Sequence, residues 1–341
     1  MCLFIRKDDK MKNKFKEITI MNAFLCLCVI MIHATSAPLT TLTQGTFWHT
    51  FIFCVNKVLC FCVPAFIFLS GFKLHNKYKN TRINLGKFYL GRLKTIVIPY
   101  VISVLLYFWY FFAKEWVLLS ELPEYIFLGT LSAHFYYIVI AVQFYLLLPL
   151  LLWAFKKFPK AFTVLSFICT LVFTEFFTFT YSDRFIGTYI FYFTMGMVFS
   201  EYKLYEKGKK LYISAAVIAA VLAVFHLWGL YKMSTGAYFY RYAEIMKLIY
   251  VTFAIVALYG LFIFLAGKSP LTVRCSGGIG KASYDIYLYH ILAISWLQYD
   301  VFPYHNLAPK WQLIITLAVV YGLAFIYSFI RSILSKKRKR D

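Results

Sequence analysis

A histidine lies inside an apolar stretch that is long enough to cross a lipid bilayer. Residues 18–37 form a twenty-residue run, ITIMNAFLCLCVIMIHATSA, which carries His33 about four-fifths of the way along. A helix of this length spans the hydrocarbon core of a membrane. An ionisable side chain inside such a run costs free energy, so it marks a functional site unless a neighbouring helix satisfies it. Imidazole changes its charge near neutral pH, so His33 is a candidate site residue whose partner has to be found.

Asn22 is predicted to share a helix face with His33. The two are eleven residues apart, and eleven steps of about 100° leave an offset of about 20° and an axial distance of about 16.5 Å. Cys26 and Val29 lie between them on that face. The spacing therefore predicts a polar stripe along one helix. It fits a catalytic histidine and a histidine that only bonds a neighbouring helix equally well.

Other polar groups lie in or beside later apolar runs. Lys87, Arg92 and Lys94 precede the third run, where basic side chains can hold phosphates or anchor the helix to lipid; the residues alone favour the anchor. Tyr287 lies three residues before His290, on the same helix face, so it could donate a hydrogen bond to that imidazole. The full set of further candidates for a polar path or an acceptor side is Asn22, Ser70, His134, Gln143, Glu175, Tyr287 and His290.

The composition predicts an all-α polytopic membrane protein. Of the 341 residues, 62% are hydrophobic, and the mean hydropathy is +0.70, whereas a soluble domain is roughly 45–50% apolar. Helices are the expected structure because open strands cannot satisfy their backbone in lipid. We predict about ten spans, at 18–37, 47–72, 95–113, 134–155, 161–178, 184–200, 211–231, 245–267, 279–298 and 311–334.

The basic residues predict the orientation of these spans. With a cytoplasmic N-terminus, 29 of the 36 Lys and Arg fall in inner segments or at inner span ends, six fall in outer segments or at outer span ends, and Lys57 lies deeper within a span. This bias is typical of the positive-inside rule and predicts that both termini are cytoplasmic. The net charge of +22 is thus a topology signal with some attraction to the lipid bilayer, and nucleic acid is not an expected partner. We predict a basic N-terminus at 1–17, one membrane domain at 18–334 and a basic tail at 335–341.

No motif for a metal or a bound cofactor is expected. The eight cysteines lie mostly inside apolar runs, where cysteine usually serves as a small apolar filler. The pairs Cys26/Cys28 and Cys60/Cys62 are two residues apart, which on a helix points the thiols about 200° away from each other. The chain has no Walker loop, dinucleotide fingerprint or nucleophile elbow.

Four stretches together resemble the membrane acyltransferase 3 family of bacterial integral membrane O-acyltransferases, in a short form without an appended extracytoplasmic domain. They are the first run ending in His33, CVPAFIFLSGF at 62–72, FYLGRLKTIVIPY at 88–100 and SYDIYLYH at 283–290. Each motif alone is loose, but their order and placement are specific. The short form with a Gly-Arg-Leu-Lys sequence is most similar to the branch that acylates cell-surface polysaccharide.

The resemblance implies a reaction and assigns roles to residues. An acyl group, usually acetyl, would move from cytoplasmic acyl-CoA to a hydroxyl of an envelope glycan outside the bacterial cytoplasmic membrane. His33 matches the family histidine and would be the general base, while Arg92 and Lys94, with Lys87, would bind the donor phosphates. Asn22 stands where the family has an arginine, so either another cation does the arginine's work or donor binding is altered.

Two interpretations from other classes remain. The same polar stripe could serve an exporter of polysaccharide or of lipid-linked sugar without covalent chemistry. The chain could also be a structural partner of a glycan synthase. Direct transfer and a relay through a covalent acyl-histidine are both compatible with the residues.

Overall fold

The computed structural model describes residues 15–177, 179–237 and 241–337, and these residues form helices without any strand. The predicted all-α class is therefore confirmed for this part of the chain. Most of the predicted basic N-terminus at 1–17 and the end of the predicted tail at 335–341 lie outside the described residues.

Seven helices of the described chain are long and apolar enough to cross a membrane. Each coincides with a predicted run, because a span is specified by its own hydropathy. They are α2 (Lys16–Thr41), Phe47–Tyr78 (α3 Phe47–Val58, a 3₁₀ turn Leu59–Phe61, and α4 Cys62–Tyr78), Leu85–Phe112 (α5 Leu85–Arg92, a π-helical turn Leu93–Val97, and α6 Ile98–Phe112), α8 (Tyr136–Lys157), α11 (Lys209–Ser234), α12 (Ala243–Lys268) and α14 (Pro309–Lys337).

The other three predicted runs are also helical but differ from typical spans. Two of them are short: α9 (Pro159–Glu175) has 17 residues and α10 (Ile190–Glu201) has 12. The third, α13 (Pro270–Trp296), has 27 residues, but its first half is rich in glycine, serine and basic residues. A short helix, α7 (Leu122–Leu128), precedes α8. The protein is thus a helical membrane protein with several spans, and the total of about ten stays a prediction.

The chain divides into two compact units, each of which is described by itself. Unit 1 comprises 1–62 and 207–341, and unit 2 comprises 63–206. Helix α2 therefore packs with α12, α13 and α14, across more than 140 residues of intervening sequence. The prediction of one membrane domain over 18–334 is not tested by this division.

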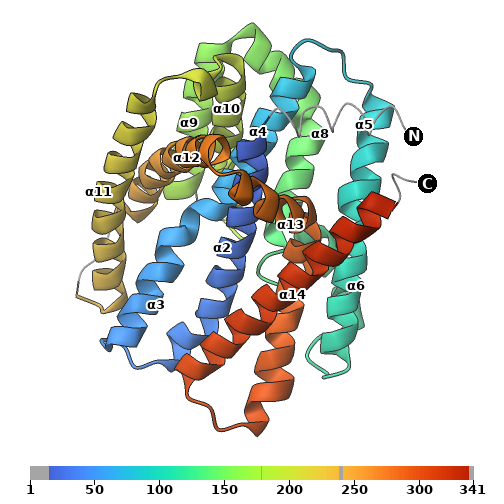
Figure 1. The fold of residues 1–341 in the computed structure, drawn as a ribbon, viewed down its shortest axis with the longest axis vertical. Helices are drawn as coiled ribbons and strands as arrows, with labels where there is room; N and C mark the ends of the chain where they lie inside the picture. The colour runs from blue at the N-terminus through green and yellow to red at the C-terminus, as the bar shows by residue number, and fades with distance from the viewer. Residues whose placement is uncertain (1–14, 178, 238–240, 338–341) are drawn as a thin grey trace. The chain divides into compact units, whose positions relative to one another are not determined.

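The core of unit 1 forms where α2, α13 and α14 pack together (Figure 1). Small and branched side chains recur on α2 at helical spacing, as the apolar stripe of a packed helix requires. Cys26 is one of these core residues and is 1% exposed. The core includes Ala23, Cys26, Ile30 and Ala34 of α2, Ile279, Ala282 and Ile286 of α13, and Val320 and Ala324 of α14.

Helices α2 and α13 run side by side in the same direction. At one end a Cβ on Gly280 would lie 2.5 Å from the carbonyl oxygen of Thr19, so only glycine permits this approach. Further along, the Cys26 thiol lies 3.7 Å from the carbonyl oxygen of Ser283. Because residue numbers rise together on both helices, the same face of α2 stays against α13 towards its far end.

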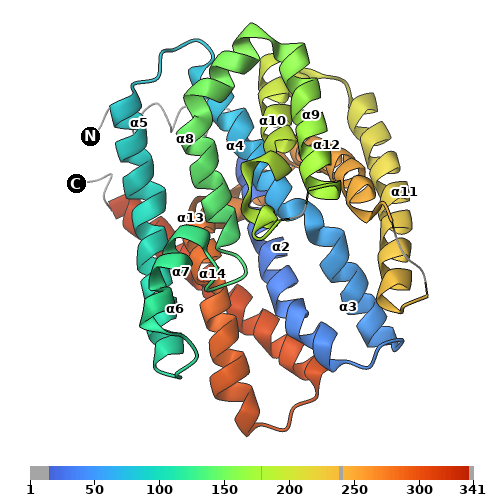
Figure 2. The ribbon, with the colours of Figure 1, turned by 180° about the vertical axis from the view of Figure 1, so that it is seen from behind.

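Unit 2 is built around close contact between α4 and α10, which Figure 2 shows together with α8 and α9. A Cβ on Gly71 would overlap the backbone of Phe193, and a Cβ on Gly196 would overlap the backbone of Phe68. Small residues at both positions let the two backbones meet, as in other membrane helix pairs. Beside this contact the rings of Phe144 and Phe193 are stacked with centroids 4.5 Å apart.

The close backbone contact between α4 and α10 predicts that a larger residue at Gly196 lowers the stability of the protein. We expect Gly196→Ala to destabilise the protein by about 1–3 kcal/mol, because the added methyl group meets backbone that cannot rotate away. Thermal unfolding of the detergent-solubilised protein measures the change. Gly91→Ala is the matched control, since a Cβ at Gly91 in α5 meets no atom within 4 Å. Equal unfolding temperatures for the two variants would contradict the packing described here.

Candidate functional site

The described part of unit 1 brings two membrane histidines together. His33 of α2 faces His290 of α13, with ring centroids 5.2 Å apart and an angle of 50° between the ring planes. His33 is half-buried and His290 is 4% exposed. Two imidazoles at this distance, shielded from bulk water, form an environment in which one ring can orient the other and handle a proton.

His290 is fixed by its own helix. Its Nδ1 lies 2.8 Å from the carbonyl oxygen of Tyr287 and 3.3 Å from that of Ile286. A hydrogen bond to a carbonyl requires a proton on Nδ1, so Nε2 is the acceptor of the neutral ring. Tyr287 thus contacts His290 through its backbone carbonyl, and the two rings lie 5.8 Å apart. The expected hydrogen bond from the Tyr287 hydroxyl to the imidazole stays a prediction.

An amide on α3 bonds to residues on both sides of His33. The Nδ2 group of Asn56 donates to the carbonyl oxygen of Ile32 and to Oγ1 of Thr35, each at 2.9 Å. Interhelical bonds of this kind fix a register between membrane helices. Asn56 was not among the residues predicted from the sequence, although an asparagine inside the apolar run 47–72 is a signal for a polar contact.

Asn22 lies on the same unbroken helix as His33, so their predicted spacing along α2 applies. The side chain of Asn22 is half-buried, while Cys26 and Val29 between the two residues are buried. The face between them is thus packed within unit 1. Its role in binding stays a prediction.

The predicted donor-binding cations belong to unit 2. The guanidinium carbon of Arg92 lies 4.7 Å from the ring centroid of Tyr145 and 5.2 Å from that of Phe88. Stacking of this kind fixes a guanidinium without neutralising its charge. Lys94 is exposed within the π-helical turn, a local irregularity that is frequent at functional sites. Lys87 is exposed on the first turn of α5, which Asn84 caps.

Two other sequence candidates of unit 2 have structural contacts. Ser70 donates to the carbonyl oxygen of Phe66 at 2.9 Å and is also bonded to the hydroxyl of Tyr137. His134 is 1% exposed, and its Nδ1 lies 3.0 Å from the hydroxyl of Ser132. Its ring packs 5.6 Å from that of Tyr107. These contacts explain both side chains by packing, and any part in an acceptor path remains a prediction.

Gln143 makes two hydrogen bonds to the backbone of the segment that connects α9 to α10. Its Nε2 donates to the carbonyl oxygen of Arg184 at 2.7 Å, and its Oε1 accepts from the amide of Ile186 at 2.9 Å. The amide is therefore engaged at both ends. Glu175 is the last residue of α9 and is half-buried.

The connection before α7 carries a carboxylate with a perturbed pKa. The hydroxyl of Tyr125 and the amide of Leu118 both donate to Glu121, at 2.6 and 3.1 Å, and these hydrogen bonds lower the pKa of that carboxyl. The group is solvated and closes the first turn of its helix, so its role is local.

The sequence-predicted residues thus fall into two sets. Asn22, His33, Tyr287 and His290 lie in unit 1, and the structure joins the two histidines. The others lie in unit 2: Ser70, Lys87, Arg92, Lys94, His134, Gln143 and Glu175. In the part of the chain that the structure describes, no three His, Cys, Asp or Glu side chains are placed to hold a metal ion.

The fold and this histidine pair define a multi-pass membrane protein with an imidazole as its candidate reactive group. A family model described as an acyltransferase domain matches residues 15–331. The chain therefore belongs to the acyltransferase 3 family and is a membrane acyltransferase that transfers groups other than aminoacyl groups. No curated protein and no solved structure shows a significant match to it.

Proposed function

We propose that the protein transfers an acyl group, most simply acetyl, from cytoplasmic acyl-CoA to a hydroxyl of an extracytoplasmic envelope glycan. The observation that carries the proposal is the contact between His33 and His290 in a chain that matches an acyltransferase family along almost its whole length. The positive-inside bias of the sequence supports about ten spans, cytoplasmic termini and a location in the bacterial cytoplasmic membrane.

The reaction needs one proton to move. His33 removes the proton of the acceptor hydroxyl as its oxygen attacks the thioester carbonyl. The new ester C–O bond forms, the C–S bond of the donor breaks, and the proton passes from the imidazole to the leaving thiolate of coenzyme A. His290 holds the orientation of the His33 ring, since its own ring is fixed by the carbonyl oxygens of Tyr287 and Ile286.

The donor's phosphates are assigned to the basic residues of α5 and the π-helical turn. The guanidinium of Arg92 is held in place by stacking on Tyr145. Its planar set of N–H donors suits a phosphate. Exposed Lys87 and Lys94 add charge on the same segment. In this proposal they supply the charge that an arginine at the position of Asn22 would have supplied. The donor is a substrate, and no bound cofactor is needed.

The test is transfer of labelled acetyl from acetyl-CoA to membrane glycan by the purified protein. We expect ester-linked label in the glycan, released by mild alkali, and dependent on both donor and protein. Absence of transfer with acetyl-CoA and with longer acyl-CoA donors would overturn the proposal. Uptake of glycan or lipid-linked sugar into vesicles without acyl transfer would then favour an exporter. Activity only in the presence of a glycan synthase would favour a partner role.

His290 gives a more specific expectation. We expect His290→Ala to lower the turnover rate about tenfold with little change in the KM for the donor, because the variant loses orientation of His33 and keeps the base. His290→Asn, whose amide can still donate to the Tyr287 carbonyl, should recover less than the whole rate. Steady-state kinetics separate the two parameters. A change confined to KM would show that His290 contacts substrate instead.

A further inference from the structure

A cavity in unit 2 is lined by more positive than negative charge and has no role in the proposed reaction. It has a volume of about 940 Å³ and lies where the ends of α4 and α8 meet the beginnings of α5 and α9. Figure 2 shows the α4–α5 and α8–α9 connections at the same end of unit 2, at the top. Three of these helices belong to apolar runs long enough to cross a membrane. The cavity therefore lies at the level of a membrane surface.

Three cations line the cavity against one carboxylate. Lys79, Arg82 and Lys156 supply the positive charge, and Glu201 supplies the negative charge. Among the described residues, the side chains of Arg82 and Lys156 make no hydrogen bond and no ion pair. An excess of three positive charges over one negative charge in one cavity favours an anionic ligand.

The floor of the cavity is preorganised. The Nδ1 atom of His75 lies 3.1 Å from the hydroxyl of Ser200, and its Nε2 lies 3.6 Å from a carboxylate oxygen of Glu201. Lys79 donates to the carbonyl oxygen of Ser200 at 3.2 Å. The carboxylate of Glu201 therefore faces His75. The ammonium group of Lys79 donates to a neutral carbonyl, so its positive charge is not neutralised by this contact.

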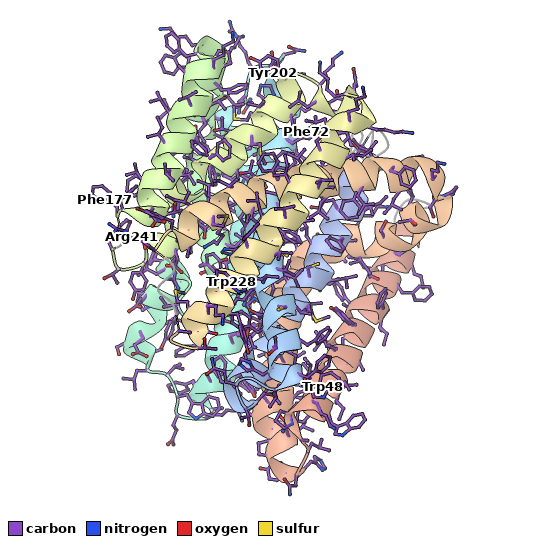
Figure 3. The ribbon with its side chains drawn as sticks, turned by 90° about the vertical axis from the view of Figure 1, so that its left-hand side faces the viewer. Trp48, Phe72, Phe177, Tyr202, Trp228 and Arg241 are labelled. Atoms are coloured by element: carbon purple, nitrogen blue, oxygen red, sulfur yellow. The ribbon has the colours of Figure 1, made fainter. Side chains whose placement is uncertain are left out.

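The wall formed by α8 continues into an apolar surface. Trp153 lines the cavity and is 58% exposed. Leu150 and Leu146 follow on the same helix face, at 56% and 60% exposure, over roughly 10 Å of helix. Exposed Tyr202, labelled in Figure 3 just after the end of α10, also lines the cavity. A charged pocket that opens onto an apolar stripe matches a headgroup with long apolar chains better than coenzyme A, whose pantetheine arm carries polar amide groups.

We propose that this cavity binds the phosphate of an anionic phospholipid, with Arg82 and Lys156 contacting the phosphate oxygens and the acyl chains lying along Trp153, Leu150 and Leu146 of α8. Basic pockets between membrane helices commonly take lipid headgroups in this way. The lining, as far as the described residues go, does not include Lys87, Arg92 or Lys94. The site is therefore separate from the residues assigned to the donor.

The test is lipid binding to the full-length protein in detergent, followed by native mass spectrometry. Dioctanoyl phosphatidylglycerol is titrated against dioctanoyl phosphatidylcholine, and coenzyme A is added in a third series. We expect the double variant Arg82→Ala/Lys156→Ala to weaken phosphatidylglycerol binding at least tenfold. Both side chains are exposed, so the fold should survive, and thermal unfolding checks that it does.

Lys157→Ala is the matched control. It removes a neighbouring charge whose Nζ lies 5.4 Å from the Trp153 ring and 5.1 Å from that of Phe158, outside the cavity lining. It should change binding less than twofold. Equal binding of the two lipids, or undiminished binding by the double variant, would overturn the proposal. Displacement of phosphatidylglycerol by coenzyme A, lost in the double variant, would show a nucleotide site and overturn the lipid assignment. These readouts do not depend on acyl transfer.

Discussion

His33→Ala and His33→Gln are expected to reduce acyl transfer by about 10²–10⁴-fold, the usual contribution of a positioned general base. The loss should appear in the turnover rate, because the imidazole acts on a proton that moves in the transition state. Steady-state transfer of labelled acetyl from acetyl-CoA to glycan, with protein checked for its unfolding temperature, measures it.

His226→Gln is the matched control for this experiment. His226 is also a buried histidine of unit 1, 2% exposed on α11, but its ring neighbour is Tyr250 of α12, with centroids 6.0 Å apart. Exchanging it should change the rate by less than threefold. A His33→Gln variant that keeps a third or more of the wild-type rate would remove His33 from the mechanism.

The same variants distinguish direct transfer from a covalent relay. A general base leaves the label on the donor until an acceptor is present, whereas an acyl-histidine intermediate labels the protein in the absence of acceptor. We expect no stable label on the wild-type protein after rapid denaturation. Stoichiometric label lost in His33→Gln would establish the relay in place of direct transfer.

The helices could be predicted from the sequence because a membrane span is specified by its own residues. Each of the seven helices long enough to cross a membrane coincides with a predicted run. The irregular elements could not be assigned in the same way. The first half of α13 is polar, yet it is helical because glycine at 280 lets it pack closely against α2.

The partners of the polar groups were harder to predict, since they depend on contacts between distant helices. His33 and His290 are 257 residues apart, and no local pattern indicates that their rings meet. Gln143 looked like a group on a polar path, but both ends of its amide bond the backbone near Arg184. Asn56 was not predicted because a single amide in an apolar run does not reveal its partners. Its two acceptors, beside His33, become known only from the packing of α3 against α2.

Arg92→Ala is expected to raise the KM for the acyl-CoA donor about 10- to 100-fold with a smaller change in the turnover rate. Hydrogen bonds between charged groups contribute about 1.5–3 kcal/mol, and a phosphate contact far from the reacting carbonyl stabilises the bound donor and the transition state alike. Arg92→Lys should recover only part of the affinity, because an ammonium has neither the planar fork nor the stacking on Tyr145.

The matched control for Arg92 is Lys114→Ala. Lys114 follows the other end of α6, and its Nζ also lies over aromatic rings, 5.0 Å from Tyr110 and 5.6 Å from Trp116. Loss of a stacked cation at that end should leave the donor KM within twofold of wild type. Equal effects of the two substitutions would show that Arg92 acts through packing alone. Wild-type KM in Arg92→Ala would leave Lys87 and Lys94 as the cations that stand in for the arginine absent at Asn22.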